Sequence, residues 1–145
     1  FPLQSFPFFF FFKRIFTIIL NANKPKPNKI DVTFSKIKTM EKLFAYASLK
    51  NEDHQKDLFG RILEGTPETL VGYILKEIQI EEEFGLVHYP IINETNKTED
   101  TISGMLYEVT KQELNQVDRY EGLHYRRVEV HLQSNQKAWA YSAAI

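Results

Sequence analysis

The stretch "KLFAYASLKN", Lys42 to Asn51, marks the start of an ordered pattern in this sequence. Its apolar run from Leu43 to Tyr46 passes directly into small residues and then into a polar segment. A short apolar run that ends in a turn is typical of a buried strand. We therefore predict a strand over Leu43 to Ala47, followed by a tight turn.

The charge of the chain changes sign just before this strand. Residues 1–39 carry seven Lys or Arg against one acidic residue, a net charge of +6, whereas residues 40–145 carry eleven against eighteen, a net charge of −7. Nine of the twelve Phe residues also lie in residues 1–39. So large an asymmetry indicates that the two segments do not form one domain.

The first segment lacks the pattern of a signal peptide or a membrane span. Lys13 and Arg14 interrupt its apolar run, whereas a signal peptide carries its positive charges before that run. Its longest charge-free stretch, residues 1–12, is shorter than the ~20 residues of a spanning helix. Phe, Lys, Ile and Asn, whose codons can consist of A and T alone, make up 23 of its 39 residues. We expect residues 1–39 to be a non-domain extension, either disordered or translated in frame from A/T-rich DNA upstream of Met40, with a membrane-surface segment as the alternative.

Residues 40–145 have the length of one small domain. The chain has no Cys, which excludes a disulfide framework and a thiol nucleophile. The acidic balance of this segment argues against nucleic acid as a partner. Its four histidines form no His-x-His pair, so we predict no metal site. We expect a cytoplasmic monomer or weak dimer that binds a small molecule and no membrane.

The hydrophobic pattern alternates short strands with two helices. The segment "NEDHQKDLFGRILEG", residues 51–65, predicts the first helix, and "TKQELNQVDRYEG", residues 110–122, predicts the second. Many strands in a short chain favour an α+β fold with a small mixed β-barrel-like curled sheet of about six strands and two short helices. Besides the first strand, the predicted strands cover residues 68–80, 86–92, 102–109, 125–133 and 137–144.

The second helix carries a candidate catalytic carboxylate. Thr110 and Glu113 have the spacing of a capping box, which predicts the start of the helix, and Gly122 is placed to end it. Glu121 therefore lies in the last turn, where the helix dipole disfavours a carboxylate. A Glu at that position beside aromatic residues is a candidate general base. The ordinary alternative is a partly exposed Glu121 that pairs with Arg119, Arg126 or Arg127.

Two stretches together resemble the γ-glutamylcyclotransferase family, in particular its small AIG2-like members. "LFAYASLK" resembles the family's apolar strand and Tyr-Gly-Ser/Thr-Leu turn, and "VDRYEGLHYRRVEVHL" resembles its Leu-Asp-x-x-Glu-Gly helix end with the following Tyr-x-Arg. "GMLYEV" (residues 104–109) and "HYPII" (residues 88–92) are similar to two further strands of the family. The resemblance covers residues 41–142 and none of residues 1–39.

This resemblance implies a reaction and a set of site residues. The α-amine of a γ-glutamyl amine or γ-glutamyl amino acid attacks its own γ-carbonyl, which gives 5-oxoproline and a free amine. Glu121 would take the place of the family's catalytic base. No metal or organic cofactor is implied, because both reacting groups belong to one molecule. The substrate-binding residues would be Tyr46, Ala47, Ser48, Leu49 and Tyr125.

Ala47 departs from the family pattern, which has Gly at this position. If the position needs a positive φ, Ala is strained by roughly 1 kcal/mol, and its methyl group also crowds the substrate. The alternative function is therefore a catalytically weak or inactive module of the same fold that binds a γ-glutamyl or amino-acid ligand. We also expect the polar loop from Asn93 to Thr101 to border the pocket.

Overall fold

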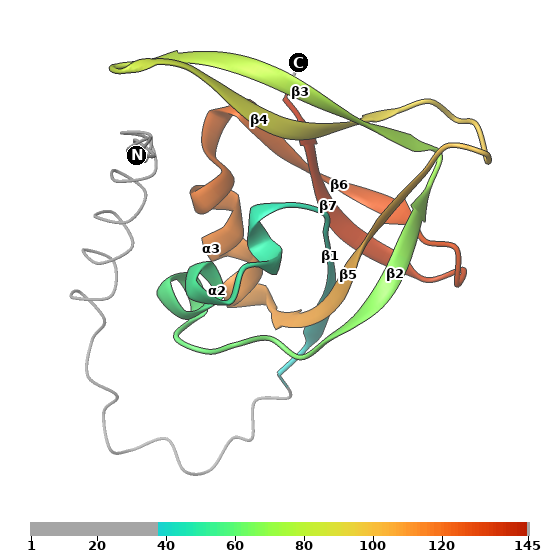
Figure 1. Cartoon of the computed structure of the whole chain (residues 1–145). Helices are drawn as coiled ribbons and strands as arrows, with labels where there is room; N and C mark the ends of the chain where they lie inside the picture. Colours follow the sequence, from blue (N-terminus) through green and yellow to red (C-terminus); the bar gives the residue numbers. More distant parts are fainter. Residues whose placement is uncertain (1–37, 145) are drawn as a thin grey trace, which may run out of the picture.

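The computed structural model describes residues 38–144, so the predicted extension lies outside the described residues except for its last two positions. The described part contains seven strands and two α-helices and confirms the α+β fold class (Figure 1). Five strands form one sheet in the order β2-β5-β1-β7-β6, and β3 pairs only with β4. The bounds are β1 Met40–Ala45, α2 Glu52–Phe59, β2 Gly65–Val71, β3 Tyr73–Glu82, β4 Gly85–Glu94, β5 Thr101–Thr110, α3 Lys111–Glu121, β6 Tyr125–His131 and β7 Lys137–Ala143.

The central strand β1 is buried on both faces, which explains its continuous apolar run. Leu43 and Ala45 belong to one core cluster, together with residues of α2 and α3. Phe44 points to the opposite face and belongs to a second cluster, inside the curl of the sheet. Successive side chains of a strand point to opposite faces, so a strand between two cores needs apolar residues at every position.

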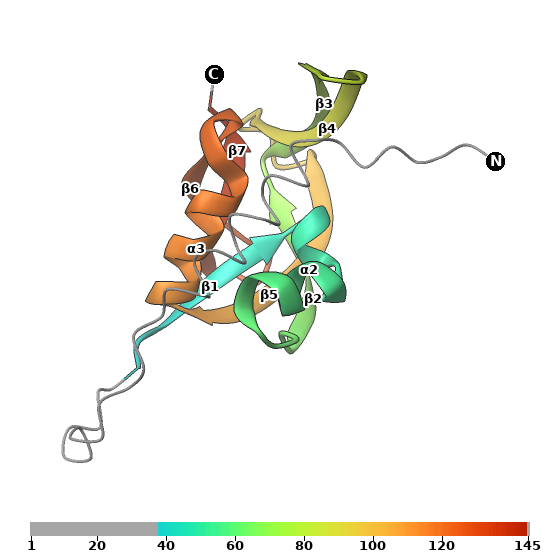
Figure 2. The ribbon, with the colours of Figure 1, turned by 90° about the vertical axis from the view of Figure 1, so that its left-hand side faces the viewer.

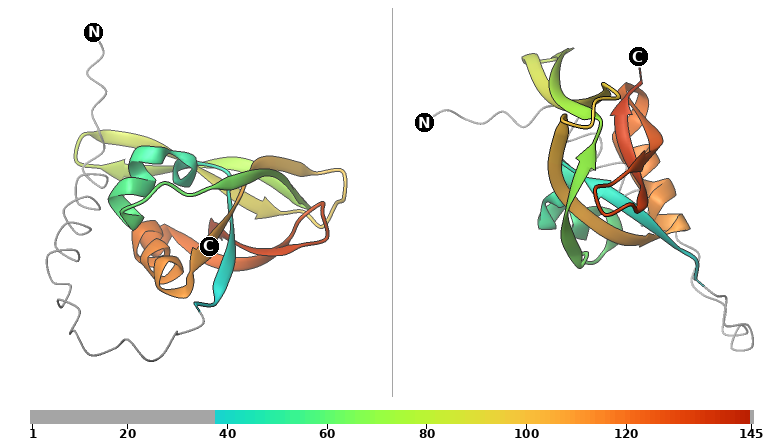
Figure 3. Two further views of the ribbon diagram at one scale, coloured as in Figure 1. Left: turned by 90° about the horizontal axis from the view of Figure 1, so that it is seen from below. Right: turned by 90° about the vertical axis from the view of Figure 1, so that its right-hand side faces the viewer.

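The five-stranded sheet curls strongly without closing into a barrel. β1 pairs with β5 in antiparallel and with β7 in parallel orientation. The two edge strands approach each other at one end, where Leu70 of β2 forms an isolated bridge with Leu132, just after β6. Figure 3 shows this curvature from two directions. Helices α2 and α3 cover one side of the sheet (Figure 2).

The prediction of one strand over residues 68–80 is wrong. The structure divides this segment at Gly72, whose φ of 82° is a conformation that glycine adopts readily. Before the glycine, β2 pairs with β5, and after it β3 leaves the main sheet to form a hairpin with β4. This hairpin lies across the end of the molecule where α3 ends (Figure 1).

The first helix is shorter than predicted. It ends at Phe59, and Gly60 follows in the left-handed conformation. Gly60 therefore ends the helix instead of lying inside it. Leu63 is buried in the connection that follows, whereas Ile62 is exposed.

The capping box predicted for the second helix is present. Thr110 Oγ1 accepts a hydrogen bond from the Glu113 N–H, and the Glu113 carboxylate accepts one from the Thr110 N–H. Arg61 donates two further hydrogen bonds to the same carboxylate, at 2.8 and 2.9 Å. Although burial opposes ionisation, the contacts with Arg61 and Thr110 hold the pKa of Glu113 below its ordinary value of 4.5.

We expect Glu113→Gln to lower the free energy of unfolding at pH 7 by about 1 kcal/mol, the upper range for a partly exposed ion pair. A lowered pKa in the folded state stabilises the protein above the unfolded-state pKa. This stabilisation is lost as the pH falls through the folded-state value, so the stabilities of the variant and the wild type should converge as the pH falls below the ordinary value of 4.5. Urea unfolding between pH 3 and 7 measures the difference, with the exposed Glu64→Gln as control. A difference that is independent of pH would contradict this origin.

Candidate active site

A small cavity lies where β1 runs into its turn, next to the last residue of α3. Its volume is about 80 Å³. That is room for several water-sized groups, since one water needs at least ~10–15 Å³ on this measure. Its wall is formed by Phe44, Ala45, Tyr46, Ala47, Ser48, Leu49, Tyr89, Pro90, Tyr120, Glu121, Tyr125 and Tyr141.

All six candidate site residues from the sequence lie on this one cavity. Glu121 comes from α3 and Tyr125 from the start of β6, whereas the other four form the turn after β1. These segments are far apart in sequence, and the fold brings them together. Whether each residue has the role implied by the resemblance stays a prediction.

The turn after β1 begins a short 3-10 helix over Ser48–Lys50, and Ala47 is its N-cap. Ala47 has a φ of −135°, so the condition of a positive φ, under which Ala would be strained, is not met in this chain. The left-handed strain considered for Ala therefore does not arise at this position. Ala47 nevertheless lines the cavity.

Buried Gln55 of α2 holds this turn in place. Its Nε2 donates to the carbonyl oxygen of Leu49 at 2.8 Å, and its Oε1 accepts from the N–H of Leu63 at 2.8 Å. Gln55 is only 2% exposed, so both hydrogen bonds are shielded from water. Asn51 caps α2 directly after the turn, since its side chain accepts from the N–H groups of Asp53 and His54.

Glu121 is buried at the end of α3. The residue is 8% exposed, so the alternative of a partly exposed surface carboxylate is wrong. Gly122 ends the helix with φ 67° and ψ −156°, which differs from the left-handed cap that the sequence predicted. This backbone conformation is accessible essentially only to glycine. The glycine thus turns the chain sharply and leaves Glu121 at the cavity.

Tyrosine hydroxyl groups surround Glu121. Burial raises the pKa of Tyr46 and of Tyr125 well above the ordinary value, and the nearby charge of Glu121 raises both further. Burial raises the pKa of Tyr120 to about 12 in spite of its hydrogen bond with Ser48. Burial, followed by a hydrogen bond to Asp118, raises the pKa of Tyr141. These hydroxyl groups therefore remain protonated at neutral pH and can donate hydrogen bonds.

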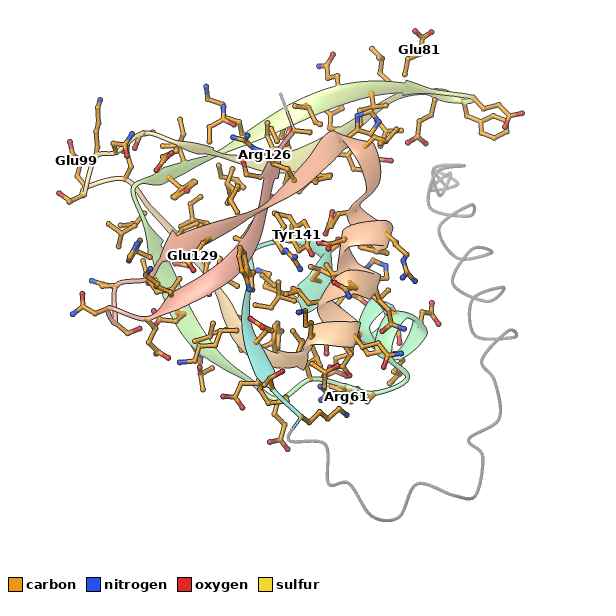
Figure 4. The ribbon with its side chains drawn as sticks, turned by 180° about the vertical axis from the view of Figure 1, so that it is seen from behind. Arg61, Glu81, Glu99, Arg126, Glu129 and Tyr141 are labelled. Carbon is orange, nitrogen blue, oxygen red and sulfur yellow. The ribbon has the colours of Figure 1, made fainter. Side chains whose placement is uncertain are left out.

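Three hydrogen bonds fix the tyrosine ring positions. Tyr46 Oη donates to the carbonyl oxygen of Tyr141 at 2.6 Å, which ties the end of β1 to β7. Tyr125 Oη donates to the carbonyl oxygen of Pro90 at 2.8 Å, which ties β6 to the hairpin. Tyr141 Oη donates to Asp118 Oδ1 at 2.6 Å, and its ring lies between α3 and the strands (Figure 4).

Sequence reasoning missed part of the cavity wall. Tyr89 and Pro90 come from the "HYPII" segment, which matched the family as a strand but was not assigned to the site. The loop expected at the pocket is absent from its lining, because Gly72 directs the β3–β4 hairpin there instead. Asn96, Lys97 and Thr98 of that loop line a separate, more open cavity beside Glu129 and His131.

Among residues 38–144, no group of three or more His, Cys, Asp or Glu side chains is arranged to hold a metal ion. None of the helices in the same part of the chain has the length and apolar character needed to cross a membrane.

A family model described as gamma-glutamyl cyclotransferase, AIG2-like, matches residues 43–144. The chain therefore belongs to this family. None of the curated proteins matches the sequence.

Solved structures share the fold at low sequence identity. The solution structure of At3g28950.1 from Arabidopsis thaliana aligns with a TM-score of 0.57 and 22% identity, over 73% of this chain and 63% of that protein. A gamma-glutamyl cyclotransferase aligns with a TM-score of 0.55 and 17% identity, over 72% and 67% of the two chains. The matched part of this chain thus spans less than two thirds of the Arabidopsis protein.

The same fold also occurs inside larger enzymes. Allophanate hydrolase from Kluyveromyces lactis aligns with a TM-score of 0.52 and 13% identity, over 72% of this chain but only 17% of that enzyme. Similarity at this level shows the fold alone. The fold is therefore compatible with more than one function, and the function has to be argued from the cavity.

Proposed function

We propose that this protein is a γ-glutamylcyclotransferase that converts a γ-glutamyl amine or γ-glutamyl amino acid to 5-oxoproline and a free amine. The α-nitrogen of the glutamyl group forms a bond with the γ-carbonyl carbon. The bond between that carbon and the leaving nitrogen breaks. The α-ammonium loses two protons as it becomes the N–H of the lactam, and the leaving nitrogen gains two as it becomes an ammonium ion, so the products are 5-oxoproline with its carboxylate and a protonated amine.

One observation carries this proposal: Glu121, a buried carboxylate, shares its cavity with the turn that the family uses to hold the glutamyl group. The α-ammonium of the substrate must lose a proton before the nitrogen can attack. A carboxylate 8% exposed to solvent is suited to accept this proton, since little water competes for it. Within the lining of the cavity, Glu121 is the one residue with a carboxylate.

The turn after β1 is the proposed site for the substrate's α-carboxylate. Ser48 and Leu49 begin a 3-10 helix, and the first N–H groups of a helix have no partner within it. Consecutive N–H groups of this kind can bind an anion. The cavity wall includes both residues, which supports this assignment.

The tyrosines are proposed to position the glutamyl chain. Their hydroxyl protons are donated within the protein, for example to the carbonyl oxygens of Tyr141 and Pro90, so their oxygen atoms can accept hydrogen bonds from the N–H groups of the substrate. Binding the substrate in a bent conformation brings its α-nitrogen close to its γ-carbonyl carbon. This proximity supplies part of the rate acceleration. No step requires a cofactor.

The second candidate is a module that binds the ligand without turnover. Ala47 favours this alternative, because it lines the cavity at a position where the family has Gly and carries a methyl group that Gly lacks. The two candidates differ in whether a bound γ-glutamyl compound is converted.

We expect Ala47→Gly to preserve or raise the rate of 5-oxoproline formation, by up to about threefold if the methyl group costs the substrate contact ~0.6 kcal/mol. The gain comes from space at the cavity and not from relief of strain, since φ at this position is −135°. In steady-state kinetics, the effect of the substitution should appear as a lower KM. A marked loss of activity in a folded variant would show that the turn does not contact the substrate as proposed.

Incubation of the full chain with a panel of γ-glutamyl compounds, followed by chromatography, tests the proposed function. The panel contains γ-glutamyl amines, γ-glutamyl amino acids and glutathione. We expect 5-oxoproline from at least one class. Binding of a panel member in calorimetry with no product from any of them would favour the module that only binds.

A further inference from the structure

The β3–β4 hairpin has two different faces. Side chains alternate along each strand, and half-buried Ile78, Ile80 and Glu82 share one face with Val87 and Tyr89, their neighbours on β4. This inner face meets the cavity at Tyr89. The outer face carries exposed residues, among them Glu81, whose side chain points away from the molecule (Figure 4).

Glu82 brings a carboxylate to this inner face. Tyr89 Oη donates a hydrogen bond to Glu82 Oε1, so the carboxylate sits directly behind a residue of the cavity wall. The hydroxyl groups of Tyr120 and Tyr125 are also close enough to act on Tyr89 electrostatically. Glu82 Oε2 is buried and has no hydrogen-bond partner in the described part of the chain. A buried carboxylate oxygen without a donor is unfavourable and leaves the negative charge of Glu82 without compensation. Glu82 itself is absent from the described lining, so this charge would act on a ligand from behind Tyr89.

The cavity offers no positive side chain to balance this charge. Its described lining contains no Lys, Arg or His, and Glu121 is itself a carboxylate. An anionic group near Tyr89 would therefore meet only uncharged hydroxyl groups and two carboxylates. A cationic group would gain from the same surroundings.

We propose that Glu82 is a specificity-determining residue: together with Tyr89 it favours substrates whose leaving amine carries a second, positively charged group and disfavours those that carry a carboxylate there. The inference rests on the proposed function, because it assigns the side of the cavity at Tyr89 to the leaving group. The Tyr89 hydroxyl group links Glu82 to the substrate, since it donates its proton to the Glu82 carboxylate and belongs to a residue of the cavity wall.

Three substrates with the same four-carbon leaving chain test this proposal. They are γ-glutamyl-1,4-diaminobutane, γ-glutamyl-butylamine and γ-glutamyl-4-aminobutyrate, whose leaving groups end in an ammonium, a methyl and a carboxylate. We expect kcat/KM in the full-length wild type to fall in that order, with about tenfold between the first and the last, because water partly screens the charge. In Glu82→Gln the ratio between the ammonium and carboxylate substrates should fall to about twofold or less.

Glu81→Gln is the matched control. It removes one negative charge from the next residue of the same strand, on the outer face, and should leave the ratio unchanged. Tyr89→Phe should reduce the ratio as well, because it removes the hydroxyl group that links Glu82 to the cavity. An unchanged ratio in Glu82→Gln, or an equal change in Glu81→Gln, would overturn the proposal.

Measurements of substrate binding test the same proposal without relying on turnover. If none of the three compounds is converted, calorimetry measures their dissociation constants for the wild type and the same variants. The proposal then predicts the same order of affinities and the same loss of preference in Glu82→Gln, although the proposed catalytic function would have failed. Equal affinities for the three compounds would overturn the charge preference in that case too.

Discussion

Glu121→Gln is expected to reduce the rate of 5-oxoproline formation by about 10²- to 10⁴-fold, the usual loss when a general base is removed. Gln has nearly the shape of Glu and keeps its hydrogen-bonding capacity, so the end of α3 should stay intact. The amide cannot accept the proton of the α-ammonium, and the attacking nitrogen then remains mostly protonated at neutral pH. The loss should appear in kcat, with KM changed much less.

The stability of the Glu121→Gln variant should equal or slightly exceed that of the wild type. The substitution removes a buried negative charge from the C-terminal end of a helix, where the dipole disfavours it. Glu99→Gln, at an exposed loop position seen in Figure 4, serves as control and should change neither property. Equal turnover by the Glu121→Gln variant and the wild type would mean that another group removes the proton.

Gln55→Leu is expected to lower the free energy of unfolding by about 2–4 kcal/mol, since it leaves two buried backbone groups without partners at ~1–3 kcal/mol each. These groups are the carbonyl of Leu49 and the N–H of Leu63. Leu fills a volume similar to that of Gln, so loss of packing contributes little. Because Leu49 belongs to the turn at the cavity, the variant should also lose activity.

Urea unfolding measures this loss, and the exposed Gln112→Leu in α3 is the matched control. The control removes the same side chain from a helix without breaking a buried hydrogen bond and should shift the stability by no more than about 0.5 kcal/mol. Similar stabilities for the two variants would show that Gln55 does not hold the turn.

The fold class could be predicted from the sequence because the strongest local patterns agree with the final structure. The apolar run of β1, the capping box of Thr110 and Glu113 and the glycine after α3 all depend on neighbouring residues. The division at Gly72 could not be predicted in this way. The apolar run from Leu70 to Leu75 continues across the glycine, and only pairing with β5 on one side and β4 on the other separates β2 from β3.

The same distinction applies to the candidate site. The resemblance identified Glu121 and the turn after β1 through short motifs, and the fold brings them together. Tyr89 and Glu82 belong to the hairpin that begins at Gly72, so their approach to the cavity depends on the part of the topology that the sequence did not reveal. The sequence left the backbone of Ala47 open, and the structure gives it a φ of −135°.

The most direct test of the central claim is the product balance of the wild-type full chain acting on a γ-glutamyl amine. Chromatography measures 5-oxoproline, glutamate and the released amine during one time course, with a protein-free sample as the background of spontaneous cyclisation. We predict that 5-oxoproline and the amine form in equal amounts and that no glutamate accumulates. Release of glutamate would show attack by water instead of the α-amine, and formation of no product above background would show that the cavity does not catalyse cyclisation.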